Sequence, residues 1–494
     1  MAASSLLVGD LFRQHASVVP SAPAVSLDSE VLTYAELNAA GNRVAAALRA
    51  EGVGHGDRVV MWADTALAVL PLFVGLAKLG AVFAPLNAHY RVDEAAPVVE
   101  LARPKLLICD DARSAAGHEI ATAPRLAQLS FSELRERAAL QPEADIREPA
   151  LHETDPHVVF FTSGSTGRPK GVVLSHRANW LRGFQGVFRD VPEISVCMFP
   201  LFHMAPFTLG LAAWQTRGEL ALVPTATAEE ILATVERRRA NRLYCIPAIW
   251  GRILAIEPSR FDTSSLREVD TGTSATPIEL VRALKQRFPG TATRIYYGST
   301  EVGSATTLAD ADVLEKPGCV GPASPGVEIK LSDDGEVCVR SPFLFDGYFE
   351  DPDATAAALR HGWFHTGDLG TLDAGGCLSI VGRMKELIRT GGESFAPTEV
   401  EEALASHPAV SEVAVVGLPD PEWGEVVCAL VVPTDGAEPT LVELQQHCEA
   451  SLAAFKKPRR LEIAEEIPRT AATGQVQRTL IVQQILSTLP KEPR

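Results

Sequence analysis

The sequence predicts an α/β protein with a large N-terminal domain of layered α/β subdomains, a β-barrel-like subdomain, and a small mobile α+β C-terminal domain. Three observations support this prediction. The 494 residues exceed one ordinary hydrophobic core, so two or three domains are expected. Strand-like and helix-like segments alternate up to about residue 380, which is typical of helices layered on mostly parallel sheets. The pattern changes after Gly382, so we expect one domain at 1–382, another at 383–494, and a hinge near Lys385.

The first part of the chain contains short buried strands and one strongly apolar helix. Residues 57–62 and 105–109 are strand-like, because each is a short apolar run. The stretch 66–86 is almost long enough to span a membrane, but it is interrupted by proline, lysine and glycine. We therefore expect a buried helix that ends near Gly80 and a buried strand after it, and no transmembrane segment.

The later segments follow the same alternation before the pattern changes. Residues 158–161 form a strand that leads into a Gly/Ser/Thr loop, and 228–239 place their apolar residues on one helical face. Short strands and turns over 318–347 predict the barrel-like subdomain. In the C-terminal domain we expect helices at 397–406 and 441–452 and strands at 413–416 and 426–432.

Composition and charge limit the classes of function. The chain is 46% hydrophobic and 22% charged, as in ordinary globular proteins, and its net charge is −17. This charge argues against sequence-independent binding of nucleic acids, which needs a surplus of Lys and Arg. None of the eight cysteines lies in a C-x-x-C pair, and residues 1–7 lack the basic start of a signal peptide. We therefore expect reduced cysteines and a cytoplasmic protein.

The strongest chemical signal is the loop Thr162–Gly171, which follows a strand. Its glycines allow close backbone approach to phosphate, and successive N–H groups can form an anion cradle. It is not a Walker A loop, because its lysine follows a proline and is not followed by Ser or Thr. We expect the following loop residues to bind phosphate: Thr162, Ser163, Gly164, Ser165, Thr166, Gly167 and Lys170.

This loop resembles the phosphate-binding signature of the adenylate-forming (AMP-binding) superfamily, which includes acyl-CoA synthetases, peptide-synthetase adenylation domains and luciferases. The resemblance covers almost the whole chain, because further segments are similar to family motifs in the right order. These segments are Pro200–His203, Gly272–Thr273–Ser274, Tyr297–Glu301, Lys316–Gly321, Trp363–Asp368 and Gly382–Lys385.

The resemblance implies a role for each of these residues. Tyr297 would stack on adenine, and Glu301 would bind Mg²⁺, which prefers carboxylate and nucleotide oxygens. Asp368 would accept hydrogen bonds from ribose, and Arg383 would reach ribose or phosphate at the domain junction. His203 either gates the acyl pocket or is a packed core histidine. Thr166 from the loop completes the implied catalytic set, and the remaining nucleotide-binding residues would be Gly272, Thr273, Ser274, Gly298, Ser299 and Thr300.

The resemblance also implies a two-step reaction with ATP, Mg²⁺ and CoA. A carboxylate attacks the α-phosphorus of ATP to give an acyl-adenylate, and a thiol then attacks the activated carbonyl after the small domain rotates. Lys385 matches the family's hinge position. Gly391 and Gly392 match the loop that faces the site during thioester formation, where they would let the pantetheine arm approach closely, although a turn without ligand contact is the alternative.

The tail departs from the family pattern at one position. The segment Ile467–Arg478 resembles the signature Pro-Arg-Thr-x-x-Gly-Lys-x-x-Arg, but it has one extra residue near Ala472 and Gln475 in place of the lysine. Glutamine keeps hydrogen-bonding ability but loses the charge that stabilises an anionic phosphoryl transition state. We expect slowed adenylation with thioester formation retained, unless Lys456 or Lys457 supplies the missing charge.

Three functions follow from these observations. The first is an ATP-dependent carboxylic acid:CoA ligase. The second is an adenylating enzyme that loads a carrier protein, and the third is a catalytically weak nucleotide- and acyl-binding homologue. A Trp closes the acyl pocket of acetate-activating relatives at the position of Gly298, so glycine there predicts room for longer or aromatic acids. The aromatic residues Phe202, Phe207, Trp214 and Tyr244 are candidates for an apolar pocket, with plain core as the alternative.

Overall fold

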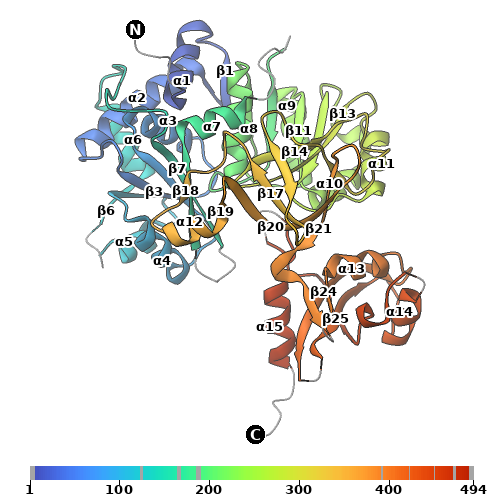
Figure 1. Cartoon of the computed structure of the whole chain (residues 1–494). Helices are drawn as coiled ribbons and strands as arrows, with labels where there is room; N and C mark the ends of the chain where they lie inside the picture. The colour runs from blue at the N-terminus through green and yellow to red at the C-terminus, as the bar shows by residue number, and fades with distance from the viewer. Residues whose placement is uncertain are drawn as a thin grey trace.

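The computed structural model describes residues 6–122, 126–163, 169–184, 191–390, 393–421, 423–449, 451–470 and 474–488. Figure 1 shows a large N-terminal part, coloured blue to yellow, and a small orange and red C-terminal part below it. Three sheets build the large part and a fourth builds the small one. The predicted α/β class, with a large and a small domain, is confirmed.

The largest sheet has eight strands in the order β14-β13-β12-β11-β9-β10-β1-β2. All of its internal pairs are parallel, and only the outer pairs β1–β2 and β13–β14 are antiparallel. Its strands are β1 (Pro23–Leu27), β2 (Glu30–Thr33), β9 (Ile194–Cys197), β10 (Glu219–Leu222), β11 (Arg242–Tyr244), β12 (Glu268–Gly272), β13 (Ala292–Ser299) and β14 (Gly303–Leu308). Parallel strands align their carboxyl ends at one edge, where α/β proteins bind ligands.

The second sheet has seven strands in the order β18-β8-β7-β4-β3-β5-β6. Its strands are β3 (Arg58–Trp62), β4 (Val82–Leu86), β5 (Leu106–Cys109), β6 (Ala127–Ser130), β7 (Pro156–Ser163), β8 (Pro169–Ser175) and β18 (Gly347–Tyr348). Side chains alternate between its faces: Val59 and Met61 join the main core, whereas Val60 and Trp62 pack in a separate cluster under α4 (Val92–Ala102). Both faces are buried, which explains the continuously apolar strands.

The third sheet is antiparallel and contains β15 (Cys319–Gly321), β16 (Glu328–Leu331), β17 (Glu336–Arg340), β19 (Leu359–Arg360), β20 (Trp363–Leu372) and β21 (Leu378–Arg383). The sequence predicts a barrel here, but the strand path runs openly from β15 to β16, and no pairing in the described residues joins these edges. The chain beside β15 instead meets β14 of the first sheet, through the bridge between Thr306 and Ala323.

The C-terminal part has its own sheet, built from β22 (Ile388–Thr390), β23 (Glu393–Phe395), β24 (Val410–Asp420), β25 (Gly424–Pro433) and β26 (Arg460–Ile463). Helices α13 (Pro397–Ala405) and α14 (Leu441–Cys448) supply apolar side chains to one core cluster. Helix α15 (Arg478–Thr488) buries Ile481 and Ile485 in a second cluster with β24 and β25. Figure 1 shows α15 beside β24, so the small part is an α+β unit.

Along the chain, the remaining helices mainly connect the strands of the large part. They are α1 (Val8–Val18), α2 (Tyr34–Ala50), α3 (Val69–Leu79), α5 (Ser114–Thr122), α6 (Phe131–Ala139), α7 (His176–Gly183), α8 (Met204–Gln215), α9 (Ala228–Arg238), α10 (Pro247–Leu254), α11 (Ile278–Arg287) and α12 (Pro352–Ala358). The predicted buried helix is α3, and Gly80 ends it in the left-handed conformation at φ +69°. Helix α14 ends at Cys448, short of the predicted Leu452.

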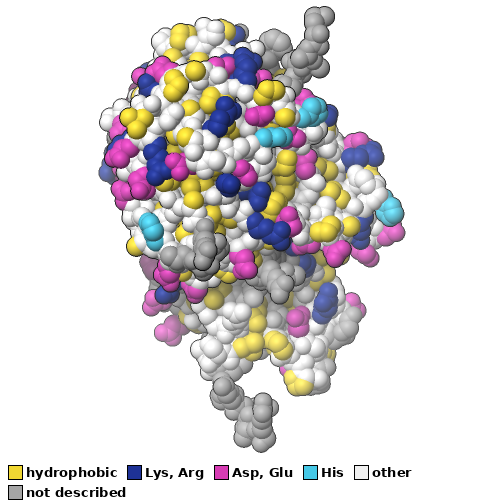
Figure 2. All heavy atoms as spheres, turned by 90° about the vertical axis from the view of Figure 1, so that its left-hand side faces the viewer, with side chains coloured by type: hydrophobic (Ala, Val, Ile, Leu, Met, Phe, Trp, Pro, Cys, Tyr) yellow, Lys and Arg dark blue, Asp and Glu magenta, His cyan; other side chains and the backbone are white. Residues whose placement is uncertain are grey.

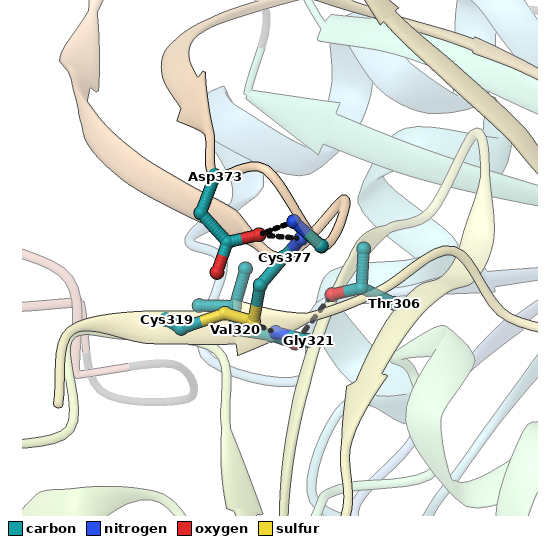
Figure 3. Close-up of a disulfide and its surroundings, with 7 residues drawn as sticks. Thr306, Cys319, Val320, Gly321, Asp373 and Cys377 are labelled. Atoms are coloured by element: carbon teal, nitrogen blue, oxygen red, sulfur yellow. Dashed lines mark hydrogen bonds between the residues drawn. A yellow bond between two sulfur atoms is a disulfide. The ribbon is translucent and has the colours of Figure 1, made fainter. Parts of the chain in front are cut away.

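One cysteine pair differs from the sequence prediction of reduced thiols. Cys319 on β15 and Cys377 before β21 form a disulfide with a Cα–Cα distance of 6.2 Å (Figure 3). The Asp373 carboxylate accepts hydrogen bonds from the backbone N–H groups of Gly375 and Cys377, which holds the turn that carries Cys377. Residues 58 positions apart thus become neighbours because two antiparallel strands meet, which spacing alone does not reveal.

None of the described helices has the length and hydropathy needed to cross a membrane. On the face drawn in Figure 2, basic and acidic side chains are interspersed.

Candidate active site

The carboxyl ends of β12 and β13 place several predicted nucleotide-binding residues together. Gly272 ends β12, and a side chain there would overlap the backbone of Tyr296 on the adjacent strand. Thr273 follows in the left-handed conformation at φ +73°, which is strained for a β-branched residue and marks functional sites in many proteins. The Tyr244 hydroxyl lies 3.2 Å from Thr273 Oγ1 and fixes the bend, whereas Ser274 is exposed.

The structure shows a close backbone contact at Gly298 that the sequence does not reveal. The β13–β14 register shifts between Tyr297 and Gly298, so a side chain at 298 would overlap the carbonyl oxygen of Gly303. Backbone packing therefore requires glycine here, whatever the size of the acyl group.

Asp368 joins two other predicted site residues. Its carboxylate accepts a hydrogen bond of 2.7 Å from the Tyr297 hydroxyl and lies 3.0 Å from Arg383 Nε. Burial raises the pKa of Asp368, while the charge of Arg383 and the bond from Tyr297 oppose that rise. Each carboxylate oxygen keeps a free lone pair, so ribose hydroxyls can still donate to Asp368. Residues from β13, β20 and the end of β21 thus form one polar cluster.

The part of β20 before Asp368 is held by Glu336 from β17. The Glu336 carboxylate accepts from His365 Nδ1 at 2.6 Å, from the Gly367 N–H at 3.0 Å and from Arg360 at 3.3 Å. Candidate metal-ligand atoms of Glu336, Cys338 and His365 lie within 4.8 Å of one another. These hydrogen bonds and the cation of Arg360 already satisfy the carboxylate, so the cluster is explained as a support for Asp368.

Glu301 lies between two hydroxyl donors. Its carboxylate accepts from Ser299 at 2.9 Å and from Tyr348 at 3.1 Å. No ion pair to Glu301 occurs within the described part of the chain. A carboxylate held by neutral donors keeps its charge for a ligand, and hard oxygen atoms are what Mg²⁺ prefers. The backbone of Thr300 precedes it in the same turn.

His203 is the N-cap of α8, and its ring lies 4.5 Å from that of Phe202. Its Nε2 atom is buried and has no hydrogen-bond partner among the described residues. Burial lowers the pKa of His203 to about 4, so the ring is neutral at pH 7. Of the aromatic pocket candidates, Phe207 and Trp214 are core: Phe207 packs on Phe73, and Trp214 Nε1 donates to the carbonyl of Ala24.

Some predicted residues lie outside the description. Gly164, Ser165, Thr166 and Gly167, the side chain of Ser163, and Gly391 and Gly392 belong to this group. The residues that flank this part of the predicted loop are described: Thr162 pairs with Lys170 near the end of the β7–β8 hairpin. Lys170 Nζ lies 4.5 Å from the ring centroid of Tyr348, the tyrosine that also donates to Glu301. The hairpin end and Glu301 are therefore close neighbours.

Comparison with known proteins agrees with this geometry. The family model described as AMP-binding enzyme matches residues 12–349, and the model of its C-terminal domain matches 399–473. The chain belongs to the AMP-binding enzyme family. It is similar to the long-chain-fatty-acid–CoA ligase FadD13 of Mycobacterium tuberculosis, with 32% identity over 98% of this chain and 99% of the relative. It is also 33% identical to an indoleacetate–CoA ligase of Aromatoleum aromaticum, over 93% of this chain and 94% of the relative.

This AMP-binding enzyme is an acid–thiol ligase that forms acyl-CoA through an acyl-adenylate. Its fold matches ATP-bound MatB from Rhodopseudomonas palustris with a TM-score of 0.86, at 28% identity over 96% of this chain and 98% of that one. The apo form of MatB matches with a TM-score of 0.78, at 28% identity over 97% and 99% of the two chains.

In the tail, the described residues on either side of 471–473 contact each other, and Gly474 lies beside the large domain. The Thr470 N–H donates to the Gln475 carbonyl at 2.8 Å, and the Gln475 N–H donates to Thr470 Oγ1 at 3.1 Å. A methyl group on Gly474 would lie 3.2 Å from Ile246, two residues beyond Tyr244. Gln475 is half-buried there, and the extra residue near Ala472 lies outside the described residues.

The other tail and hinge residues have defined partners. Arg478 pairs with Glu386 at 3.2 Å and with Glu401 at 2.7 Å, so it links the tail to the short 3₁₀ turn that contains Lys385. Lys456 pairs with Glu399, and Lys457 pairs with Glu449 at 3.0 Å. Both lysines have carboxylate partners, which argues against either one replacing the missing lysine.

Sequence reasoning missed Tyr348 and Arg182, both of which contact the turn that carries Glu301. Tyr348 lies 47 residues from Glu301 and belongs to no quoted motif, so no signal in the sequence identified it. Arg182 lies on the helix after the phosphate loop, where an arginine is read most simply as a surface residue.

Proposed function

We propose that this CoA ligase activates an apolar monocarboxylic acid with MgATP, and that Gln475 makes adenylation its slow half-reaction. The observation that carries the proposal is the cluster of Tyr297, Asp368 and Arg383 beside Glu301, at the domain junction. This cluster joins a base-stacking ring, a ribose acceptor and a permanent cation on three separate strands or strand ends. Together these groups suit a nucleotide, and the family match supports an adenine nucleotide.

The nucleotide would extend from Tyr297 and Asp368 toward the end of the β7–β8 hairpin. Backbone N–H groups of the loop at 162–167 and Lys170 would then surround the phosphates. Arg383 at the end of β21 would approach the ribose or phosphate side and couple nucleotide binding to the hinge near Lys385. The domain boundary at 382–383 coincides with the end of the third sheet, which supports a rotation at this point.

The described residues fit a magnesium ion. Glu301 offers a carboxylate with free lone pairs, and the resemblance assigns Thr166 of the phosphate loop to the same catalytic set. Mg²⁺, when bound, would neutralise charge on the phosphate oxygens. Ser299 and Tyr348 would hold the Glu301 carboxylate in its orientation by their hydroxyl hydrogen bonds.

The acid would lie near Tyr244, Phe199 and Thr273. The rings of Phe199 and Tyr244 are 5.6 Å apart, and the neutral ring of His203 follows Phe202 on the same segment. The nearest buried arginine on this strand, Arg242, is already paired with Glu193 and Asp270, so no free cation on β11 favours a second carboxylate. One relative is named for long-chain fatty acids and another for indoleacetate, which supports a long or aromatic monocarboxylic acid.

Gln475 matches, in the tail motif, the lysine that would reach the reacting phosphate in the family. Its loop touches Ile246 beside the proposed acyl site, which supports a role in adenylation. Without the charge, adenylation would be slowed and thiolysis of a supplied acyl-adenylate would not. The β22–β23 hairpin, whose last described pair is Thr390 and Glu393, would face the pantetheine arm after rotation, and Gly391 and Gly392 lie between these two residues in the sequence. Six cysteines outside any disulfide agree with the proposed cytoplasmic location, whereas the Cys319–Cys377 disulfide argues against it.

The test is a panel of acids scored for pyrophosphate release and for thioester formation with CoA. We expect both products with fatty or aryl acids and neither with acetate or dicarboxylic acids. Pyrophosphate without CoA thioester, together with transfer to a carrier protein, would favour the carrier-loading alternative. Nucleotide binding without pyrophosphate for any acid would identify a binding homologue and overturn the proposal.

A further inference from the structure

Arg182 is an almost completely buried cation whose donors go to backbone carbonyls. It lies near the end of α7, and 2% of the residue is exposed. Its Nε donates to the Phe343 carbonyl at 2.9 Å, and its two terminal nitrogens donate to the carbonyls of Thr300 at 2.8 Å and Glu301 at 2.7 Å. No carboxylate forms an ion pair with it in the described ranges.

Burial of an unpaired cation is costly, so its presence calls for a reason. Burial lowers the pKa of Arg182 to about 10, and the nearby charges of Glu301 and Asp346 oppose that fall, so the group stays charged at pH 7. A guanidinium offers five donors in a rigid plane, which lysine cannot reproduce. Three carbonyls arranged around this plane are therefore fixed relative to one another.

Arg182 and the carbonyls that it contacts follow strands of three different sheets. Arg182 itself follows β8 of the seven-stranded sheet, on the helix after the phosphate loop. Thr300 and Glu301 connect β13 to β14 of the eight-stranded sheet, and Phe343 follows β17 of the third sheet. Arg182 thus joins all three sheets at the point where the proposed phosphate and metal groups meet.

A second contact supports the same turn. The Phe345 N–H donates to the Glu301 carbonyl at 2.8 Å, so this oxygen accepts from both Arg182 and the connection between β17 and β18. A side chain on Gly303 would be 3.2 Å from Arg182, so the β14 backbone packs directly on the arginine stem. The direction of the Glu301 side chain therefore depends on Arg182.

We propose that Arg182 is a positioning residue for adenylation, which holds the Thr300–Glu301 backbone so that the Glu301 carboxylate stays beside Tyr348 and Lys170. The proposal rests on the proposed role of Glu301 in binding Mg²⁺. It gives Arg182 no contact with substrate: its effect passes through Glu301.

The experiment compares Arg182→Lys and Arg182→Met with wild type. Arg177→Met is the matched control, because Arg177 lies on the same helix but half of its side chain is exposed. We measure the Mg²⁺ concentration that gives half-maximal pyrophosphate release, and the thermal shift produced by ATP with and without Mg²⁺. A loss of stability alone would lower the melting temperature without changing the difference between these two shifts.

We expect kcat/KM for MgATP to fall about 10²-fold in Arg182→Met, because misplacement of a catalytic group by about 1 Å has that effect. Arg182→Lys should raise the Mg²⁺ requirement about tenfold, since it keeps the charge but loses at least one hydrogen bond. Both variants should lose the extra thermal shift from Mg²⁺, and Arg177→Met should keep it.

The proposal would be overturned if folded Arg182→Lys had the Mg²⁺ requirement and the Mg²⁺-dependent thermal shift of wild type. If Arg182→Met does not fold, Arg182→Lys alone tests the proposal. The proposed function fails separately: wild type would then release no pyrophosphate with any acid. In that case the Mg²⁺-dependent thermal shift still reports whether Arg182 positions Glu301.

Discussion

Replacing Gln475 by lysine should accelerate adenylation. The Gln475 backbone is fixed by its bonds to Thr470, and Gly474 packs on Ile246, so the substitution changes the side chain without opening the loop. A preorganised donor or charge at a developing anion contributes about 10²–10³ in rate. Because Gln475 is half-buried and therefore partly screened by solvent, we expect the lower end, about 10².

The assay separates the two half-reactions. Pyrophosphate release with MgATP and a fatty or aryl acid should rise in Gln475→Lys, whereas CoA thioester formation from supplied acyl-adenylate should not change. Gln483→Lys on the exposed side of α15 adds the same charge away from the site and should have no effect. Equal pyrophosphate rates in wild type and Gln475→Lys, or equal acceleration of both half-reactions, would refute the reasoning.

Three other predictions follow from the contacts. Tyr297→Phe removes the donor to Asp368 and should raise the KM for ATP about tenfold with little change in kcat; an unchanged KM would contradict a ribose-binding role for this cluster. Burial lowers the pKa of His176 to about 3 and that of the stacked His157 well below its usual value. Below pH 6.5 these two histidines are therefore protonated in the unfolded chain but stay neutral in the folded chain. As the pH falls toward 3, each histidine should lower the free energy of unfolding by about 1.4 kcal/mol per pH unit. Urea unfolding at pH 7 and pH 5 should show this fall in the free energy of unfolding, and the fall should be smaller in His157→Phe by the contribution of one histidine. An identical fall in wild type and His157→Phe would show that His157 is not held neutral by burial. Reducing the Cys319–Cys377 disulfide, which closes a loop of 58 residues, should destabilise the protein by about 4 kcal/mol. Cys319→Ser should be equally destabilised and insensitive to reductant, and two additional alkylated thiols should appear only after reduction of wild type.

The sequence predicted most of the secondary structure, because burial leaves strong local patterns. The helix that ends at Gly80 and the amphipathic helix from Ala228 were predicted from apolar spacing and a left-handed cap. The third sheet was predicted as barrel-like, and this was not confirmed, because the choice between closure and pairing beside β14 depends on contacts between distant strands. The cysteine pair was missed for the same reason.

The chemistry divides in the same way. The sequence by itself determined which chemical groups are available, because Tyr297, Glu301, Asp368, Arg383 and the substituted Gln475 stand in ordered motifs. Only the tertiary structure decided how these groups are held. Glu336 binds the backbone next to Asp368, Tyr348 donates to the Glu301 carboxylate, and Arg182 donates to the Glu301 carbonyl. Motifs collect the residues that the resemblance assigns to ligands, whereas the supporting hydrogen bonds join residues as far as 161 positions apart. Such contacts form only when distant strands pair or separate sheets pack together, so they leave no local pattern in the chain.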